Sequence, residues 1–455
     1  MSIHLRRRPV IGALPVFHVH PVFAVLPCLA AFAIFLAAFL HLRTFALAED
    51  VAAPAISGRL ERVDGIAVLT LWGSPRERGF AHGWLLAEEV VRLAEEGFAL
   101  LGQGAEATLS RLAPLMTAGF SFSADETAEM EGIADAVAKR LPGRKVKPLD
   151  RALTLVDLKI INTFGDWYAL GCSSATAWGK LTPDGKPVAV RNWDFLLMRS
   201  LEAVQHVRVA APAGDEKARG WVGVALPGCI APVTAMNDEG VFAAINDVFV
   251  RPGVKDYIQP NVPRLIALRR ILESVPASGA VEKAADLCRT WNTLFGNNFL
   301  IVTPSPAGGL PAGVLKYDTR EDRERGVTLR GPDGGEGNAA LEFLACSNGH
   351  RLRGKDSCWR YDALAKCCAE RKEPFDLDAL RDLVSRAAVP ARGAPVGKAS
   401  LATAHQAIAF TGERRLWIRF LESREKNIRD AKGVDFRVDA LLSRAKAPAS
   451  PAPKS

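Results

Sequence analysis

The sequence predicts an α+β fold in which the middle of the chain forms sheets and helices cover them. Two observations lead to this prediction. The chain has 455 residues, of which 49% are hydrophobic and 24% are charged, the balance of a large packed globular protein rather than of a disordered, collagen-like or polytopic membrane chain. Short apolar runs separated by Gly, Pro and Asn begin at Cys172, whereas helical periodicity precedes and follows them. Strands flanked by helices favour sheets covered by helical layers.

The first 48 residues read as a signal peptide or membrane anchor. Three arginines at 6–8 precede an uninterrupted apolar run at 21–40, and Ala-Leu-Ala at 46–48 has the small-x-small pattern that signal peptidase cleaves. Twenty apolar residues would also span a bilayer, so an uncleaved anchor is the alternative. In both cases we expect the rest of the chain to be exported to the periplasm or the extracellular space.

Upstream of the β-rich region the chain reads first as strand and then as helix. Residues 58–72 are predicted to form a strand, which the turn residues at 73–75 end. Ser123 and Glu126 have the spacing of a capping box, which marks the start of a helix. Apolar residues at helical spacing predict helices over 76–101, 124–141 and 149–167. We therefore expect residues 49–171 to form a mainly helical N-terminal part.

Residues 172–445 read as a β-rich core that also contains helices. Turn residues such as those at 183–185 separate the expected strands, which lie at 172–179, 187–192, 204–210, 221–226, 241–246, 299–303, 314–317, 341–347, 407–411 and 415–420. The expected helices of this part lie at 263–274, 280–290, 359–370 and 376–388. The tail 446–455, rich in Ala, Pro and Lys, is expected to be disordered.

The net charge of +8 does not point to a nucleic-acid partner. Four arginines and no acid lie in residues 1–48, so the remainder carries only +4. No stripe of Lys and Arg interleaved with aromatic residues is present. We therefore expect no nucleic acid among the partners, and membrane contact only through the N-terminal segment.

The eight cysteines give no clear disulfide pattern. Cys28 leaves with the leader if the leader is cleaved, and an odd number remains, so one cysteine would stay unpaired even if the others formed bridges. The simplest interpretation is that most of them are small buried hydrophobic residues. No Cys-x-x-Cys pair stands with a second pair or with histidines at ligand spacing, so we expect neither a metal nor a cofactor.

The densest group of reactive residues is Cys172 with Arg191 and Asp194. The turn at 183–185 would fold the strand that carries Arg191 and Asp194 back onto the strand that begins at Cys172. A guanidinium beside a thiol favours the thiolate, and a nearby carboxylate can orient an amine or imidazole. A buried cysteine next to a surface Arg–Asp pair fits the same residues, so this pattern alone leaves both interpretations open.

Two motifs in sequence order resemble a known enzyme group. The Gly-Cys-Ser at 171–173 and the Arg-Asn-Trp-Asp at 191–194 are similar to the choloylglycine hydrolase and penicillin acyltransferase group of N-terminal nucleophile (Ntn) hydrolases. Further motifs of the group lie at 73–79, 82–83, 236–240, 346–348, 357–360, 405–407 and 415–418. The resemblance, which spans about residues 58–420, implies a four-layer αββα sandwich of two packed, mainly antiparallel sheets covered by helices.

The resemblance also implies that the chain cleaves itself between Gly171 and Cys172. Gly171 has no Cβ, which lets the thiol approach the preceding carbonyl. Cleavage frees the α-amine of Cys172, whose ordinary pKa of about 8 suits a general base at neutral pH. Cys172 would then attack a linear amide, or an ester, and release the acyl group to water or another acceptor. The product would be a two-chain heterodimer, with homo-oligomerisation left open.

Five further residues take their expected roles from the resemblance. Arg191 would lie beside the sulfur, and Asp194 would hydrogen-bond the new amine. Asn237 would point its side-chain amide into the oxyanion hole. Asn348 would position the amine or the tetrahedral intermediate, and Arg360 would complete the polar surroundings.

The expected substrate is a small acylated amine or amino acid rather than a folded protein. Members of the group act on such compounds, and residues 195–198 form a run too apolar for an ordinary exposed loop. This run could line an acyl pocket beside Cys172, although packing in the core is the alternative. Gly349 separates Asn348 from His350, a departure from the Thr-Asn-His of the acyltransferase branch that bears on the choice of acceptor.

Two other function classes remain open at this point. An unprocessed papain-like thiol enzyme would pair Cys172 with His350 or His405, but no helix pattern directly follows the cysteine to activate it. A non-catalytic exported binding or scaffold protein could keep the same fold, although it would have no need for Cys172, Arg191, Asp194 and Asn237 together.

Overall fold

The computed structural model describes residues 55–167, 171–196, 205–214, 216–248, 259–304, 309–317, 327–332, 341–349, 351, 358–391 and 401–445. The expected leader at 1–48, the expected disordered tail at 446–455 and His350 lie outside these residues. Among the described residues, no helix is both long and apolar enough to cross a membrane.

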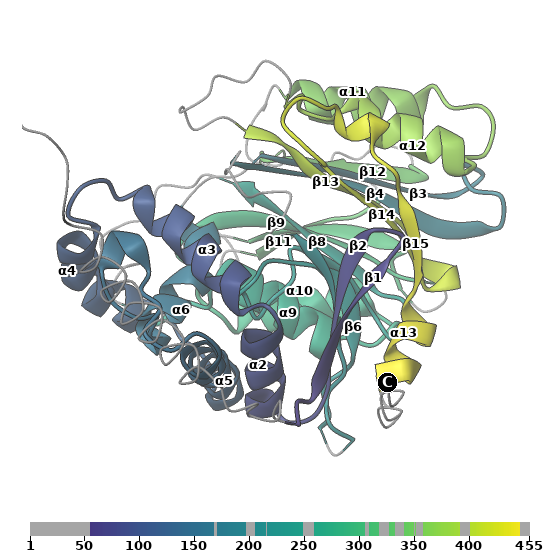
Figure 1. The fold of residues 1–455 in the computed structure, drawn as a ribbon. Coiled ribbons are helices and arrows are strands. Elements are labelled where there is room, and N and C mark those ends of the chain that lie inside the picture. Colours follow the sequence, from purple (N-terminus) through teal and green to yellow (C-terminus); the bar gives the residue numbers. More distant parts are fainter. Residues whose placement is uncertain are drawn as a thin grey trace, which may run out of the picture. The chain divides into compact units, whose positions relative to one another are not determined.

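Two sheets form the centre of the fold (Figure 1). The nine-stranded sheet has the order β1 (Gly58–Val63), β2 (Ile66–Leu71), β5 (His206–Ala210), β6 (Trp221–Ala225), β7 (Thr234–Asn237), β8 (Phe242–Val248), β9 (Gly296–Val302), β10 (Ala312–Tyr317), β11 (Val327–Arg330). The six-stranded sheet has the order β12 (Phe343–Cys346), β3 (Cys172–Gly179), β4 (Gly185–Leu196), β13 (Leu401–Phe410), β14 (Arg415–Phe420), β15 (Val434–Arg437). Within these strands every pairing is antiparallel except that of β2 with β5.

Helices cover the outer faces of both sheets (Figure 1). Helices α11 (Trp359–Ala369) and α12 (Leu377–Arg386) lie on the six-stranded sheet, and α9 (Arg264–Ser274) and α10 (Ala280–Arg289) lie on the nine-stranded sheet. The inner faces meet where β3 contacts β8 and β4 contacts β9. The expected α+β sandwich with helix, sheet, sheet and helix layers is therefore confirmed.

The N-terminal part supplies both strands and helices. Strands β1 and β2 extend the nine-stranded sheet through the parallel β2–β5 pairing. The helices of this part are α2 (Pro75–Leu85), α3 (Ala87–Ala99), α4 (Ala105–Ala118), α5 (Ala124–Arg140), α6 (Leu155–Asn162) and α7 (Phe164–Trp167). The capping box expected at Ser123 and Glu126 opens α5 as predicted. This part packs with the β-rich core into one compact unit, residues 56–455.

Three predicted elements differ from the structure for local reasons. Residues 58–72 form a hairpin instead of one strand, because Asp64 and Gly65 both adopt positive φ, at 50° and 90°, as a tight two-residue turn requires. The helix predicted over 76–101 breaks at Leu86, whose backbone leaves the helical region at φ −122° and ψ 30°. The helix predicted from residue 149 begins only after Thr154, which caps α6.

Some elements had no sequence prediction at all. These are α4, β7, β11, β15 and the last helix α13 (Val438–Ala445). Strands β7, β11 and β15 are each four residues long, too short to show a period of their own. They are defined by their partners in the sheets.

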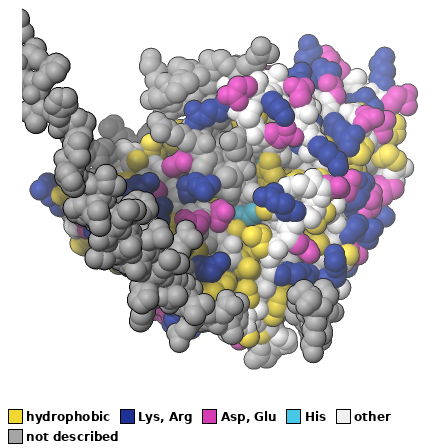
Figure 2. Space-filling model, viewed as in Figure 1, with side chains coloured by type: hydrophobic (Ala, Val, Ile, Leu, Met, Phe, Trp, Pro, Cys, Tyr) yellow, Lys and Arg dark blue, Asp and Glu magenta, His cyan; other side chains and the backbone are white. Residues whose placement is uncertain are grey.

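The seven described cysteines are all free thiols, and five of them are buried. This agrees with the interpretation of most cysteines as small packing residues. On the face of the molecule in Figure 2, Lys and Arg side chains are interspersed with Asp and Glu. The described residues of this face therefore form no continuous basic stripe.

Helices α2 and α5 cross in close contact at glycines. A Cβ at Gly79 would collide with the backbone carbonyl of Glu129, and one at Gly132 with that of Arg76. Gly79, the last residue of the 73–79 motif, thus has a packing role, since it lets the two helix backbones approach each other.

We expect Gly79→Ala to lower the free energy of unfolding by about 1–3 kcal/mol, because the added methyl forces α2 and α5 apart. Gly97→Ala on α3 is the matched control: no atom lies within 4 Å of its added Cβ, so better helix propensity should raise stability by up to about 1 kcal/mol. Thermal unfolding of both variants checks this. Equal Tm changes in the two variants would contradict the packing argument.

Candidate active site

The hairpin of β3 and β4 brings the predicted thiol and guanidinium together. Cys172 is the first residue of β3 and pairs with Trp193, and Ser174 pairs with Arg191. Paired residues point to the same face of a sheet, here the inner face between the two sheets. Nη2 of Arg191 donates to Sγ of Cys172 at 3.1 Å. Both side chains are buried.

Arg191 is held by acceptors from the opposite sheet. Its Nη1 donates to Oδ1 of Asn246, its Nη2 to the carbonyl of Ile245, and its Nε to Oγ1 of Thr234 at 3.4 Å. Asn246 was not predicted from the sequence. It is one of two adjacent polar residues, with Asp247, near the end of the otherwise apolar strand β8, and this break in the pattern was the available signal.

The surroundings of Cys172 favour the protonated thiol at neutral pH. Burial raises its pKa to about 11, Arg191 opposes this shift, and the carboxylates of Asp247 and Asp194 add to it. The guanidinium contact therefore only partly offsets the cost of forming a thiolate in a buried site.

A second set of polar groups surrounds the backbone on the other side of the Cys172 strand. The Asp194 N–H donates to the Gly171 carbonyl at 2.9 Å. The Cys172 N–H donates to Oδ1 of Asn348 at 2.8 Å, and Nη2 of Arg360 donates to the same oxygen at 2.8 Å. Arg360 also forms an ion pair with Asp194. Asp194, Asn348 and Arg360 thus meet at the Gly171–Cys172 peptide bond.

The Asp194 carboxylate is fixed from two sides. Oγ1 of Thr403 on β13 donates to its Oδ1 at 2.6 Å, and Arg360 at the start of α11 pairs with its Oδ2. Burial raises the pKa of Asp194, while Arg360 opposes the rise. Because residues alternate along β4, Asp194 faces away from the thiol, whereas Arg191 faces it.

Gly171 occupies a position with no room for a side chain. A Cβ there would lie 2.8 Å from Nη1 of Arg360 and 3.0 Å from Oδ2 of Asp194. The contact with Arg360 is shorter than real Cβ atoms show, so a larger residue would have to push the Arg360 guanidinium, which is paired with Asp194, out of its place. Glycine at this position therefore avoids a steric conflict with the ion pair.

Asn237, which the resemblance places in an oxyanion hole, forms its hydrogen bonds with other groups in the structure. Nδ2 of Asn237 donates to the carbonyls of Leu272 and Val275 at 3.1 and 3.0 Å. Its Oδ1 accepts from the backbone N–H groups of Glu239 and Val241. With both amide hydrogens used at the end of α9, Asn237 fixes a turn and leaves no N–H for a substrate.

His405, one of the two histidines considered for a papain-like pair, does not contact the thiol. Its Nε2 lies 3.1 Å from Oγ1 of Thr234, and Thr234 in turn accepts from Arg191. Burial, followed by the charge of Arg191, holds the pKa of His405 well below its usual range. A neutral histidine that is separated from the thiol by Thr234 and Arg191 is a poor partner for it.

Arg264 forms a network of ion pairs with Asp247, the neighbour of Asn246 on β8, and with Asp166. Arg264 at the start of α9 lies 3.4 Å from a carboxylate oxygen of Asp247 and 3.4 Å from one of Asp166 in α7. The Arg264 N–H also donates to Asp166. Burial raises the pKa of Asp166 to about 7, and Arg264 opposes the rise. Asn348 donates to the Asp247 carbonyl, which connects this network to Cys172.

An apolar cavity of about 540 Å³ opens beside the site. Its wall near the thiol includes Trp193, Phe195 and Ile245, and Asp247 is the one charged residue among the described lining residues. The remaining wall comes largely from α3, α4 and α6, including Leu93, Phe98, Leu101, Leu109, Leu112, Ile160 and Ile161. Of the apolar run at 195–198, Phe195 lines the cavity, while Leu197 and Met198 lie outside the described residues.

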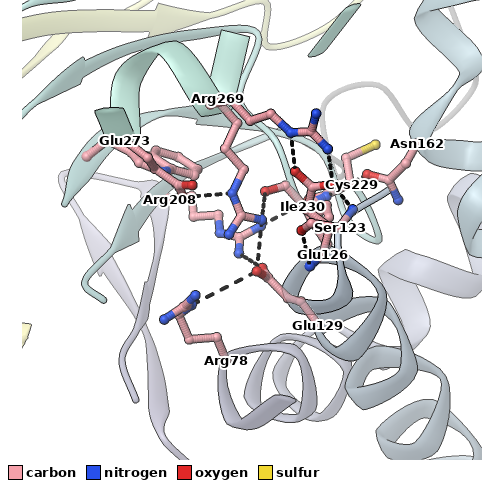
Figure 3. A network of polar contacts seen from close by, with 12 residues as sticks. Arg78, Ser123, Glu126, Glu129, Asn162, Arg208, Cys229, Ile230, Arg269 and Glu273 are labelled. Atoms are coloured by element: carbon pink, nitrogen blue, oxygen red, sulfur yellow. Dashed lines mark hydrogen bonds and ion pairs between the residues drawn. The ribbon is translucent and has the colours of Figure 1, made fainter. Parts of the chain in front are cut away.

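Helix α5 of the N-terminal part is tied to the β-rich core by buried charges (Figure 3). Glu129 of α5 is fully buried and forms ion pairs with Arg208 of β5 and Arg269 of α9. Burial opposes its ionisation, but Arg269, Arg208 and Arg78 lower the pKa of Glu129 to about 2. The carboxylate is thus charged at every physiological pH.

The described residues include no group of three or more His, Cys, Asp or Glu side chains that could hold a metal ion.

Comparison with known proteins gives distant structural similarity only. No protein-family model matches the chain, and no curated protein matches its sequence. The chain is similar to an N-acylethanolamine-hydrolyzing acid amidase (NAAA) ortholog of Caenorhabditis elegans, with 13% identity, a TM-score of 0.38, and coverage of 57% of this chain and 98% of the other.

Two further similarities are of the same kind. One is to a cysteine-to-alanine variant of the conjugated bile acid hydrolase of Clostridium perfringens, with 13% identity, a TM-score of 0.36, and coverage of 58% and 96%. The other is to penicillin V acylase of Agrobacterium tumefaciens, with 11% identity, a TM-score of 0.38, and coverage of 55% and 84%. Similarity at this level carries no argument about activity.

The raised pKa of Asp166 predicts a pH-dependent stability. Between about pH 4 and pH 7 the folded chain keeps a proton on Asp166 that the unfolded chain releases, so the free energy of unfolding falls as the pH rises through this range. We expect Asp166→Asn to match the wild-type Tm at pH 5 and to exceed it at pH 8, measured by calorimetry. Asp125→Asn, an exposed change on α5, is the control. Parallel Tm profiles for wild type and Asp166→Asn would contradict the assignment.

Proposed function

We propose that this chain is a self-processing thiol amidohydrolase or acyltransferase that cleaves small linear amides through a thioester on Cys172. One observation carries the proposal: polar groups contact two different atoms of Cys172, its sulfur and its backbone nitrogen. Arg191 contacts the sulfur, while Asn348 accepts from the backbone nitrogen that would become an α-amine. A cysteine with only a packing role has no use for polar groups on both atoms.

The geometry at Gly171–Cys172 supports a route for the proposed self-cleavage. Sγ of Cys172 attacks the Gly171 carbonyl carbon, and the thiol proton passes to the departing Cys172 nitrogen, which exchanges the peptide bond for a thioester. Water then cleaves the thioester to a Gly171 carboxylate, a free thiol and a free α-amine. The Asp194 N–H already donates to the Gly171 oxygen and would stabilise the charge that develops there.

The processed enzyme would use the α-amine of Cys172 as its base. Its ordinary pKa of about 8 places it in reach of neutral pH, and it takes the thiol proton as the sulfur attacks the substrate. Asn348 and Asp194 would orient the amine, and Arg191 would hold the sulfur. Hydrolysis, or transfer to another acceptor, completes the cycle.

The apolar cavity supports an acyl group as the part of the substrate that is recognised. It begins at Trp193, the cross-strand partner of Cys172, and ends among α3 and α4. An acyl chain that starts at the sulfur would extend along it, and each buried methylene would contribute about 0.8 kcal/mol.

The cleaved chains would remain together as a heterodimer. Residues 49–171 contribute two strands to the large sheet and most of the cavity wall. Buried contacts cross the boundary, including Glu129 with Arg208 and Arg269, and Glu126 with Arg270. Export through the segment 1–48 is part of the same proposal and rests on the sequence alone.

We expect the purified protein to separate under denaturing conditions into two chains that meet at Gly171–Cys172, and Cys172→Ala to stay as one chain without amidase activity. Intact-mass analysis and a denaturing gel measure this. The proposal fails if the active protein is a single chain, or if Cys172→Ala keeps full activity.

A variant of the preceding residue separates the steric argument from loss of the nucleophile. Gly171→Ala keeps the thiol but pushes against Arg360 and Asp194, so we expect cleavage to slow at least tenfold. Gly214→Ala, where a Cβ would have nothing within 4 Å, is the control and should be cleaved at the wild-type rate.

Chain length tests the acyl cavity. We expect kcat/KM to rise about fourfold per added methylene in a series of N-acyl amines until the cavity is filled, which corresponds to about 0.8 kcal/mol each. Leu112→Glu places a charge at the distant wall and should reduce kcat/KM for long acyl groups only. Leu60→Glu is the matched control, since both leucines are 40% exposed and Leu60 lies in β1, away from the cavity. A flat dependence on chain length would contradict the acyl assignment.

A further inference from the structure

Asn298 of β9 is a fully buried asparagine that no sequence motif singles out. Its Nδ2 donates to the carbonyls of Ser347 and Gly349, at 2.9 and 3.0 Å. These two carbonyls flank Asn348. One side-chain amide thus grips the backbone on both sides of the residue whose Oδ1 accepts the Cys172 N–H.

The backbone carbonyls at residues 347–349 need hydrogen-bond donors from outside their own strand. Strand β12 ends at Cys346, so the chain leaves the ladder with β3 just before Asn348. The carbonyls of Ser347 and Gly349 have no strand partner there, and buried carbonyls require a donor. Asn298 pairs with Asn246 in the β8–β9 register, so it faces the same inter-sheet space as the residue that holds Arg191.

The two hydrogen bonds constrain the direction of the Asn348 side chain. Fixing the carbonyls before and after a residue restricts its φ and ψ, and these determine where its side chain can point. The Asn348 side chain forms hydrogen bonds with the Cys172 N–H, with Arg360 and with the Asp247 carbonyl, and all of them require that direction.

The geometry points to Asn298 as a positioning residue for the reaction of Cys172, acting through Asn348 rather than on the substrate. This inference rests on the proposed function, because it assigns a purpose to the Asn348–Cys172 contact. Asn298 is absent from the cavity wall, so it should affect the chemical step and leave acyl binding unchanged. A shift of about 1 Å in a reacting group can cost on the order of a hundredfold in rate.

The test compares four variants of the processed enzyme. We expect Asn298→Ala to lower kcat about 10- to 100-fold with KM within about twofold. Asn298→Asp has the same shape but turns an acceptor toward the two carbonyls, so it should be worse than Ala. Asn298→Ser, which keeps one donor in a smaller side chain, should lie between Ala and wild type. Asn297→Ala is the matched control, because Asn297 is equally buried, points to the opposite face of β9, and has neither amide atom paired among the described residues.

The pH profile supplies a readout that loss of packing would not change. When Oδ1 of Asn348 accepts a hydrogen bond from the charged α-amine of Cys172, the pKa of the amine rises. A variant that frees Asn348 should therefore lower the pKa of the amine and move the acidic limb of kcat/KM to lower pH. Wild-type kcat in both Asn298→Ala and Asn298→Asp would overturn the inference. So would a loss in Asn297→Ala equal to that in Asn298→Ala. If the wild type itself neither cleaves nor turns over amides, it is the proposed function that fails.

Discussion

The buried guanidinium of Arg191 is the constraint on which the rest of the site depends. It belongs to the six-stranded sheet, yet most of its acceptors lie on β7 and β8 of the nine-stranded sheet. A buried cation is costly unless its N–H groups are satisfied, so the two sheets must meet in the one register that supplies Thr234, Ile245 and Asn246. The position of the Cys172 sulfur follows from that register, because the same guanidinium donates to it.

Because side chains alternate along β4, the polar residues of this strand contact different groups on its two faces. Arg191 points between the sheets toward the sulfur, and Asp194, three residues later, points to the other face toward Arg360. A period of two makes this division unavoidable for residues separated by an odd number. One strand can therefore contact the Cys172 thiol on one side through Arg191 and hold Arg360 on the other through Asp194, without requiring the two sets of groups to compete for space.

Sequence reasoning found the parts of this arrangement that depend on local signals. The turn at 183–185 predicted the β3–β4 hairpin, and with it the approach of Arg191 to Cys172. The hydrogen bonds of Asn237 were not predicted, because they go to carbonyls at the end of α9, which are distant in sequence. Asn246 and Asn298 were missed for the same reason. Each is one of two adjacent polar residues in an otherwise apolar strand, and its contacts become visible only when the order and register of the nine-stranded sheet are known.

The parallel pairing of β2 with β5 has a consequence for how the protein can be made. Without β1 and β2, the strand β5 would be the edge of the large sheet, and its unpaired N–H and C=O groups would offer a template for association with other chains. The second half of the molecule would be prone to aggregate if it were synthesised alone. Translation as one polypeptide delivers the protecting strands in equal number and ahead of the edge they cover, so the proposed cleavage at Gly171–Cys172 would come after folding.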